Sequence, residues 1–219
     1  ADDIYEVFAR RFDMWQGEGV FSEEAPSIRH KTKTMVLGCG YGVGFKRFAS
    51  ISGMSEGEAE DAVKLYRRTM PKVVGLWNKL TRKIHLCYSN QTPFTYTLPS
   101  GREMNYGYIQ AALQNGRREY FARIFKGPKK IPMKLWGGLM AENLSQALAR
   151  DVFANILIEL DKAGHKVIFH VHDEVVIECA EEKAEEVLNS TLEIMSAPPS
   201  WIPNLPIQGE GKIVNKYEK

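Results

Sequence analysis

The most informative stretch of this sequence is Arg29-His-Lys-Thr-Lys33-Thr-Met-Val-Leu37-Gly-Cys-Gly-Tyr41-Gly42. Arg29, Lys33, Leu37 and Tyr41 recur at every fourth position, and on an α-helix each such step drifts by only about 40°. We therefore expect the four side chains to line one slanted stripe of a helix that begins after an N-cap at Ser27 and ends near Gly42. Cations at one end, an apolar side chain in the middle and an aromatic ring at the far end suit a nucleoside triphosphate.

The far end of this predicted helix is rich in glycine, at positions 38, 40, 42 and 44. Each glycine weakens a helix by up to roughly 1 kcal/mol relative to alanine. Close backbone approach or movement would explain their presence. The alternative for the whole stretch is a basic amphipathic surface helix with a glycine-rich end.

The second informative stretch is His172-Asp173-Glu174, which lies between two apolar runs, residues 166–171 and 175–179. This pattern predicts a strand, a tight polar turn and a second strand. Two carboxylates at an exposed hairpin tip suit Mg²⁺, which prefers oxygen ligands. The alternative is a solvated acidic turn with no ligand.

The remaining pattern is mostly helical at first and mixed later, so the expected fold class is α+β with a helical half and a sheet half. Ser55 and Glu58 form a predicted capping box, and Pro71 suits the first turn of the next helix. Asp2 or Asp3 is expected to cap the first helix. Further helices are expected at 2–15, 56–70, from 71 past 84, at 135–163 and at 181–195. A hairpin is expected at 92–108 and a short strand at the C-terminus. The connecting stretches are a loop at 22–26, a basic, turn-rich stretch at 115–132 and a proline-rich tail at 198–206.

Composition limits the class of protein without naming a function. The 219 residues are 44% apolar and 26% charged with a net charge of +2, as in ordinary globular proteins. Three widely spaced cysteines argue against a zinc site or a disulfide framework and for a reducing compartment. No apolar run approaches a membrane span, so we expect a cytoplasmic protein with no membrane partner. Residue 1 is Ala rather than Met, which suggests that the chain begins inside something larger.

Residues 29–42 resemble motif B of family A DNA polymerases, in which R-x-x-x-K is followed eight residues later by Y-G. By that resemblance Arg29 and Lys33 grip the incoming triphosphate, and Lys33 belongs to the catalytic set. Tyr41 would stack near the templating base, and Tyr41 and Gly42 would contact the DNA. Leu37 would face the sugar, where the family usually has Phe or Tyr, so the chain departs from the pattern at the residue nearest the sugar.

Residues 171–175 resemble motif C of the same family. The resemblance makes Asp173 a ligand of Mg²⁺, Glu174 a nearby catalytic acid and His172 a contact to the primer strand. Gln146 falls where the family places a glutamine that reads the minor groove beside the primer end; the alternative is a polar side chain satisfied within its helix. The Pro-Ser-Gly turn near residue 100 and the proline-rich tail resemble phage-type members, which implies host cytoplasm for a phage-encoded chain.

The resemblance implies fingers at residues 1–134 and the C-terminal part of the palm, with an antiparallel sheet, at 135–219. Its partners would be primer-template DNA and a dNTP. The family's acidic motif A is absent from this sequence. We therefore expect a polypeptide or upstream segment that supplies motif A and the thumb. Whether that partner also carries an exonuclease stays open. Two alternatives stay open: a single-subunit RNA polymerase fragment, against which Glu174 argues because those enzymes typically have Ser there, and a non-catalytic DNA-binding module descended from a polymerase.

Overall fold

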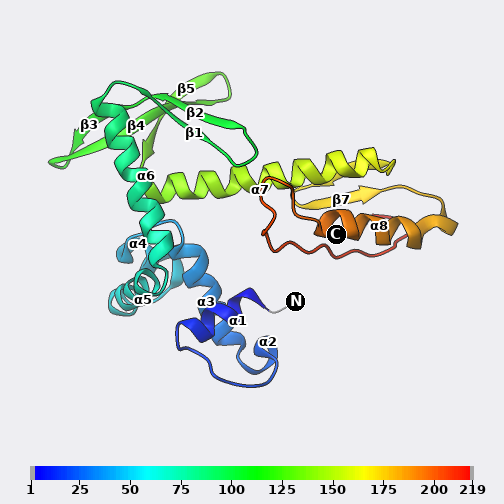
Figure 1. Ribbon diagram of the computed structural model, residues 1–219. Helices are drawn as coiled ribbons and strands as arrows, with labels where there is room; N and C mark the ends of the chain where they lie inside the picture. The colour runs from blue at the N-terminus through cyan, green and yellow to red at the C-terminus, as the bar shows by residue number, and fades with distance from the viewer. Residues whose placement is uncertain (1–2, 218–219) are drawn as a thin grey trace. The chain divides into compact units, whose positions relative to one another are not determined.

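The computed structural model describes residues 3–217 and divides into two compact units. The first unit contains residues up to 96 together with 104–144, and the second contains 97–103 with 145–219. Helices dominate the first part of the chain, and the strands form small antiparallel sheets (Figure 1). The expected α+β class is confirmed. The division between the units falls inside one helix, whereas the sequence placed a boundary at residue 134.

Six helices precede the first strand, and their ends follow local sequence signals. Asp3 caps the first helix through a hydrogen bond from the Tyr5 backbone, whereas Asp2 lies outside the described residues. The predicted capping box of Ser55 and Glu58 is present, and Pro71 begins the last helix of the group. The helices are α1 (Ile4–Arg11), α2 (Phe21–Glu24), α3 (Pro26–Cys39), α4 (Phe45–Ser52), α5 (Glu56–Thr69) and α6 (Pro71–Ser89).

Two expectations in this region are wrong. Residues 22–26 are not a loop, because α2 forms there around the fully buried Phe21. Ser27 is not the N-cap of α3, because Pro26 occupies its first turn and fits there with its missing N–H. The helix also ends at Cys39 rather than near 42, and Gly42 adopts a φ of 77° that only glycine takes at no cost.

The packing of α3 on α4 explains why residue 38 is a glycine. A Cβ atom on Gly38 would lie 2.7 Å from the ring of Phe48, which is fully buried on α4. The missing side chain therefore lets α3 and α4 approach closely, as expected from the sequence. Ala9, Trp15, Phe21 and Ala25 form another buried cluster, against which Ile28 of α3 packs.

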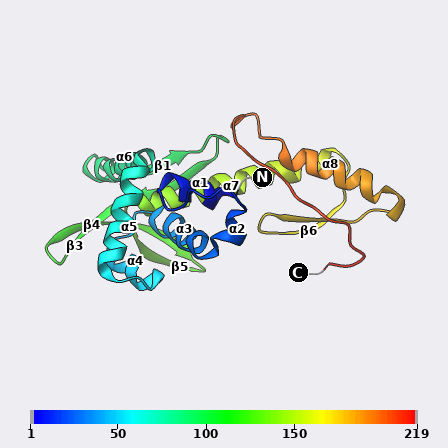
Figure 2. The same ribbon diagram turned by 90° about the horizontal axis from the view of Figure 1, so that it is seen from below.

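Two sheets follow α6 in the first unit. Strands β1 (Pro93–Thr97) and β2 (Glu103–Tyr108) form the expected hairpin. Strands β3 (Gln110–Gln114), β4 (Arg117–Lys126) and β5 (Lys129–Leu135) form a three-stranded antiparallel sheet in that order (Figure 2). The stretch at 115–132, expected to be turn-rich, is therefore mainly sheet. The residues that indicated turns form the two hairpin turns of this sheet, Asn115-Gly116 and Gly127-Pro128. Asn115 and Gly116 both have positive φ.

The second unit is built on the long helix α7 (Gly137–Lys162), of which it contains the part after residue 144. Val152, Ile156 and Leu160 of α7 are buried against strands β6 (Val167–Val171) and β7 (Glu174–Ile177), and against the C-terminal tail. The short helix η1 (Glu181–Lys183) leads into α8 (Ala184–Ser196), whose side chains join the same core. These elements match the sequence expectation closely.

The expected terminal strand is wrong, because residues 207–217 contain no strand. The tail instead runs along α8: a Cβ atom on Gly209 would lie 2.9 Å from Met195, and one on Gly211 would lie 2.6 Å from Leu188. Close packing of these two glycines on the helix replaces strand pairing. Within the described residues, no helix combines the length and apolar character needed to cross a membrane.

Candidate functional site

Two cations on α3 face a single aromatic ring on α1. The Arg29 guanidinium lies 5.3 Å from the centroid of the Tyr5 ring, and the Lys33 ammonium lies 5.9 Å from it. The side chains that α3 buries, Thr32 among them, lie about a quarter turn away around the helix. The spacing of four residues therefore places Arg29 and Lys33 together, as the sequence predicted, and Lys33 remains exposed. Such a pair can bind an anion with several oxygens.

Asp3 is a partner of Arg29 that the sequence did not reveal. Its carboxylate accepts a hydrogen bond from the Arg29 Nε and forms an ion pair with it. Burial raises the pKa of the Asp3 carboxyl, but the hydrogen bonds from Arg29 and the backbone and the charge of Arg29 outweigh it, so the net pKa is lowered. The two residues are far apart in sequence, so no local pattern indicated the contact.

The lowered pKa of Asp3 predicts a pH dependence of stability. A carboxyl with a depressed folded-state pKa contributes stability that is present above its ordinary value of 3.8 and is lost as the pH falls through the folded-state pKa. We expect the Asp3→Asn chain to lose less stability than the unmodified chain as the pH falls through this range. Urea denaturation followed by circular dichroism at several pH values measures this difference, and parallel curves for the two chains would contradict it.

Leu37 and Tyr41 have different environments. Leu37 is on α3 and 52% exposed, so it is free to contact a ligand. Tyr41 lies beyond the end of α3, in the turn, and does not continue the helical stripe. The indole N–H of Trp77 donates a hydrogen bond of 3.1 Å to the Gly40 carbonyl, and a Cβ atom on Gly138 would lie 1.8 Å from the Tyr41 carbonyl oxygen. The turn that carries Tyr41 and Gly42 is therefore held from two sides.

The acidic hairpin forms as expected in the second unit. Val171 pairs with Glu174 across the turn, so His172 and Asp173 are the two turn residues, and all three polar side chains are exposed. His172 has a φ of 53°, a left-handed conformation that costs a non-glycine residue roughly 1–2 kcal/mol. Strain of this kind is concentrated at functional sites. Among residues 3–217, no group of three or more His, Cys, Asp or Glu side chains is arranged to hold a metal ion.

Tyr217 contacts this hairpin from the C-terminal tail. Its ring packs edge-on against Phe169 with the centroids 5.1 Å apart, and its hydroxyl donates a long hydrogen bond of 3.5 Å to Glu174. Desolvation, the charge of Glu174 and this hydrogen bond raise the pKa of the Tyr217 hydroxyl. No periodic pattern in residues 207–217 predicted this contact.

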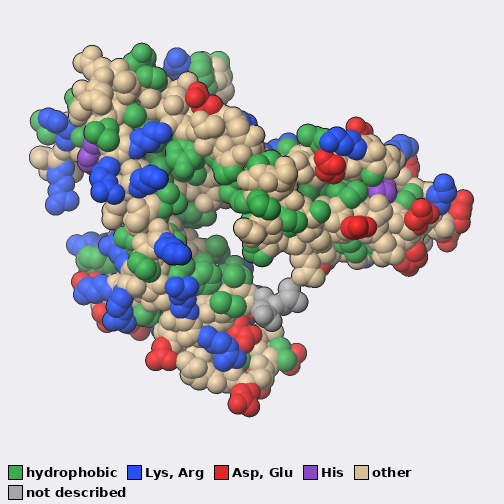
Figure 3. Space-filling view, viewed as in Figure 1, with side chains coloured by type: hydrophobic (Ala, Val, Ile, Leu, Met, Phe, Trp, Pro, Cys, Tyr) green, Lys and Arg blue, Asp and Glu red, His purple; other side chains and the backbone are tan. Residues whose placement is uncertain are grey.

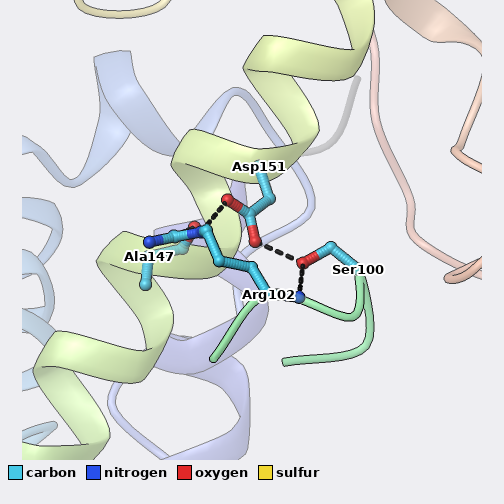
Figure 4. Close-up of polar contacts among 4 residues, drawn as sticks. All are labelled: Ser100, Arg102, Ala147 and Asp151. Carbon is cyan, nitrogen blue, oxygen red and sulfur yellow. Dashed lines mark hydrogen bonds and ion pairs between the residues drawn. The ribbon is translucent and has the colours of Figure 1, made fainter. Parts of the chain in front are cut away.

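Gln146 is exposed on α7 and precedes Ala147 in the sequence. Ala147 takes part in a set of polar contacts with Ser100, Arg102 and Asp151, which we call the polar clamp (Figure 4). Asp151 of α7 accepts hydrogen bonds from the Ser100 hydroxyl and from the Arg102 Nε, the latter at 2.7 Å. Arg102 also donates to the Ala147 carbonyl at 3.0 Å. These bonds fasten the turn between β1 and β2 to the helix that presents Gln146. Sequence reasoning found this turn but not its partner Asp151.

The clamp predicts a loss of stability on mutation. The Asp151 side chain is only 11% exposed and accepts one charged and one neutral hydrogen bond. We expect Asp151→Ala to lower the free energy of unfolding by about 2 kcal/mol, in the range for hydrogen bonds to charged groups. Urea denaturation measures the change. Asp161→Ala, which removes an exposed carboxylate from the same helix, is the control and should change stability by less than about 0.5 kcal/mol. Equal effects of the two substitutions would contradict the assignment.

The predicted site residues thus form two groups. Arg29 and Lys33 gather around Tyr5 in the first unit, with Leu37 on the same helix and the turn of Tyr41 and Gly42 just beyond it. The second unit holds the hairpin residues 172–174 and Gln146. In the view of Figure 3, Lys and Arg side chains are frequent over α5, α6 and the β3–β4 end of the sheet, and Asp and Glu side chains over α8.

The family model for DNA polymerase family A matches residues 1–219. A DNA polymerase of Bacillus phage SP02 is 32% identical in an alignment 240 residues long. The alignment covers 99% of this chain and 36% of the phage protein. The chain belongs to DNA polymerase family A. This membership agrees with the resemblance seen in residues 29–42 and 171–175.

Two further matches have lower sequence identity. The thermostable DNA polymerase I of Thermus aquaticus is 25% identical over 174 residues, which cover 78% of this chain and 18% of that protein. Among solved structures, the POL domain of Pol1 from M. smegmatis, in complex with DNA primer-template and dNTP, matches 88% of this chain and 30% of its own with a TM-score of 0.58 and 18% identity. That likeness shows the polymerase fold. The chain spans about a third of the length of the phage relative and about a fifth of the Thermus one.

Proposed function

We propose that this chain is the part of a DNA-directed DNA polymerase that grips the incoming dNTP and supplies one acidic metal-binding motif. The observation that carries the proposal is the pair of cations, Arg29 and Lys33, on one face of α3 in a family A chain. In the proposed complex both bind the triphosphate oxygens, and Arg29 exchanges the carboxylate of Asp3 for phosphate. We assign the first unit to the fingers and the second to the C-terminal part of the palm.

The turn after α3 serves the template side of the proposed site. Tyr41 and Gly42 contact the DNA at the templating base, and the hydrogen bond from Trp77 and the close approach of Gly138 keep their backbone in place. Leu37 lies one helical turn beyond Lys33 and faces the sugar. On α7, the exposed Gln146 contacts the minor groove beside the primer end, and His172 contacts the primer strand.

The hairpin carboxylates fit a hard cation, because both are exposed at the tip and neither forms a salt bridge with another described residue. Asp173 holds Mg²⁺, and Glu174, which receives the Tyr217 hydrogen bond, positions the metal or the primer end. When bound, Mg²⁺ neutralises charge on the transferring phosphoryl group and favours ionisation of the attacking hydroxyl.

The proposed site is completed by ligands from outside this hairpin. Holding two metal ions for phosphoryl transfer would call for carboxylates from more than one element, whereas Asp173 and Glu174 are neighbours in a single hairpin. We assign the further ligand to motif A, carried by a polypeptide or upstream segment that also supplies the thumb. The outward-facing apolar side chains of β6, with Ile168 49% exposed, offer a surface for a neighbouring strand. We call this motif A-bearing partner the complementing segment.

Nucleotide selectivity tests the proposed function. With the complementing segment added, we expect the chain to incorporate the dNTP that pairs with the template base and to reject NTPs. Extension with each dNTP, NTP and dideoxynucleotide on four templates that differ at one base measures this. Equal use of NTPs would favour the RNA polymerase alternative, and incorporation that ignores the template would refute the proposal. Dideoxynucleotide use reports on Leu37 separately.

A further inference from the structure

The three-stranded sheet packs on α6 with one face, and its other face carries exposed side chains of β4 beside the half-buried Glu119 and Phe121. Tyr120 of β4 lies 4.6 Å from His85 and 5.4 Å from Tyr88 of α6, measured between ring centroids, and Ala122 is fully buried. Because side chains alternate along a strand, the even-numbered residues of β4 face α6. The outer face consists of the odd-numbered residues 117–125 of β4 with the even-numbered residues 130–134 of β5 and 110–114 of β3, by the strand register.

Cations and aromatic rings alternate on this outer face. Along β4 the order is Arg117, Glu119, Phe121, Arg123 and Phe125, and the facing residues of β5 add two lysines. Four cations thus accompany a single carboxylate, Glu119, which pairs with Lys134. Within residues 3–217, Arg117, Arg123 and Lys130 enter no salt bridge. A face of this composition is complementary to a polyanion.

Phe125 is the unusual residue on the face. Its side chain is 70% exposed, although phenylalanine normally lies in the core. The ammonium of the facing Lys130 lies 4.9 Å from the ring centroid. An aromatic surface and a cation that can reach a phosphate are therefore held side by side. Base stacking on exposed aromatic rings beside a basic groove is the common way in which proteins bind single strands.

The spacing of the face favours an extended strand over a duplex. Phe121 and Phe125 are four positions apart on β4, about 13 Å. A base can stack on either ring only where no neighbouring base covers its face. Paired and stacked bases of a duplex present no such exposed ring faces, whereas unpaired template bases do.

We propose that the outer face of the β3–β4–β5 sheet binds single-stranded DNA, with bases stacked on Phe125 and Phe121 and phosphates contacted by Arg123 and Lys130. The proposal rests on the proposed function in taking the unpaired template as the strand that is bound. It assigns a function to the basic stretch at 117–134, which has no part in the proposed roles of α3 and the 172–174 hairpin.

Fluorescence anisotropy of a labelled oligo(dT) strand with the 219-residue chain tests the proposal, without nucleotide or metal. We expect Phe125→Ala to weaken binding of the strand by about five- to a hundredfold, in the range for loss of one stacked base, and Phe125→Tyr to preserve it. Arg123→Glu should weaken binding and reduce its salt dependence. Lys183→Glu makes the same charge change on η1 in the other unit and should leave binding unchanged.

Three results would overturn the proposal. Unchanged strand binding by Phe125→Ala excludes stacking, and tighter binding of a blunt duplex than of the single strand assigns the face to duplex DNA. Equal loss in Arg123→Glu and Lys183→Glu shows a response to net charge alone. Because Phe125 is exposed, its truncation removes no core contact, and circular dichroism checks the fold. A Lys33→Ala chain that binds the strand normally, but extends a primer more slowly than the unmodified chain when each is supplied with the complementing segment, separates this proposal from the proposed function.

Discussion

We expect a chain carrying Asp173→Ala, supplied with the complementing segment, to extend a primer about a thousandfold more slowly than the unmodified chain. Metal ions contribute several kcal/mol of charge stabilisation to phosphoryl transfer, and each 1.36 kcal/mol corresponds to a factor of ten in rate. The substitution should leave DNA binding intact, because Asp173 is exposed in the turn and supports no core contact. Single-turnover extension and DNA binding, measured on the same preparation, separate the two effects.

Glu193→Ala is the matched control for Asp173→Ala, because it removes an exposed carboxylate from α8 in the same unit. It should extend primers at the normal rate. Unchanged extension by Asp173→Ala would refute the assignment of Asp173 as a metal ligand and would favour the non-catalytic DNA-binding alternative. Loss of both DNA binding and the circular dichroism signal would show instead that the hairpin supports folding.

We expect Lys33→Ala to lower kcat/KM for the incoming dNTP by about ten- to a hundredfold. The loss corresponds to one charge-assisted hydrogen bond, about 1.5–3 kcal/mol. Arg29→Ala should have a similar effect, and it should also release Asp3 from its ion pair. The measurement is the dNTP dependence of single-turnover extension with the complementing segment present.

Lys31→Ala is the control on the same helix. Lys31 is exposed but lies only two positions from Lys33, which places it on a different side of α3. Its removal should leave kcat/KM unchanged, and Lys33→Arg should retain part of the activity, because arginine keeps the charge. A loss in Lys31→Ala as large as that in Lys33→Ala would show that only the overall charge of α3 matters.

Local sequence signals predicted most of the helices and the hairpin around residues 172–174. The capping box at Ser55, the proline at 71 and the apolar strands around residues 172–174 act over a few residues, so their consequences can be read from sequence. The end of α3 was misplaced because Gly40 and Gly42 leave the helix, whereas the spacing of four continues through Tyr41. The terminal strand was wrong because the tail packs on α8, which depends on tertiary contacts.

The three-stranded sheet was missed for a different reason. Its outer face carries charges where a half-buried strand normally shows a clear alternation of apolar and polar residues, so residues 117–126 gave no period-two signal. The partners Asp3 and Asp151 were missed because they meet Arg29 and Arg102 only in the folded chain. The spacing of Arg29 and Lys33 was sufficient to place those two together, since both lie on one helix.

The central claim is that this chain carries half of an active site. Primer extension by the 219-residue chain alone, and again after addition of the complementing segment, tests it most directly. We predict no extension above background by either part alone and templated, Mg²⁺-dependent extension by the mixture. Robust extension by the chain alone would contradict the claim that the site is completed from outside.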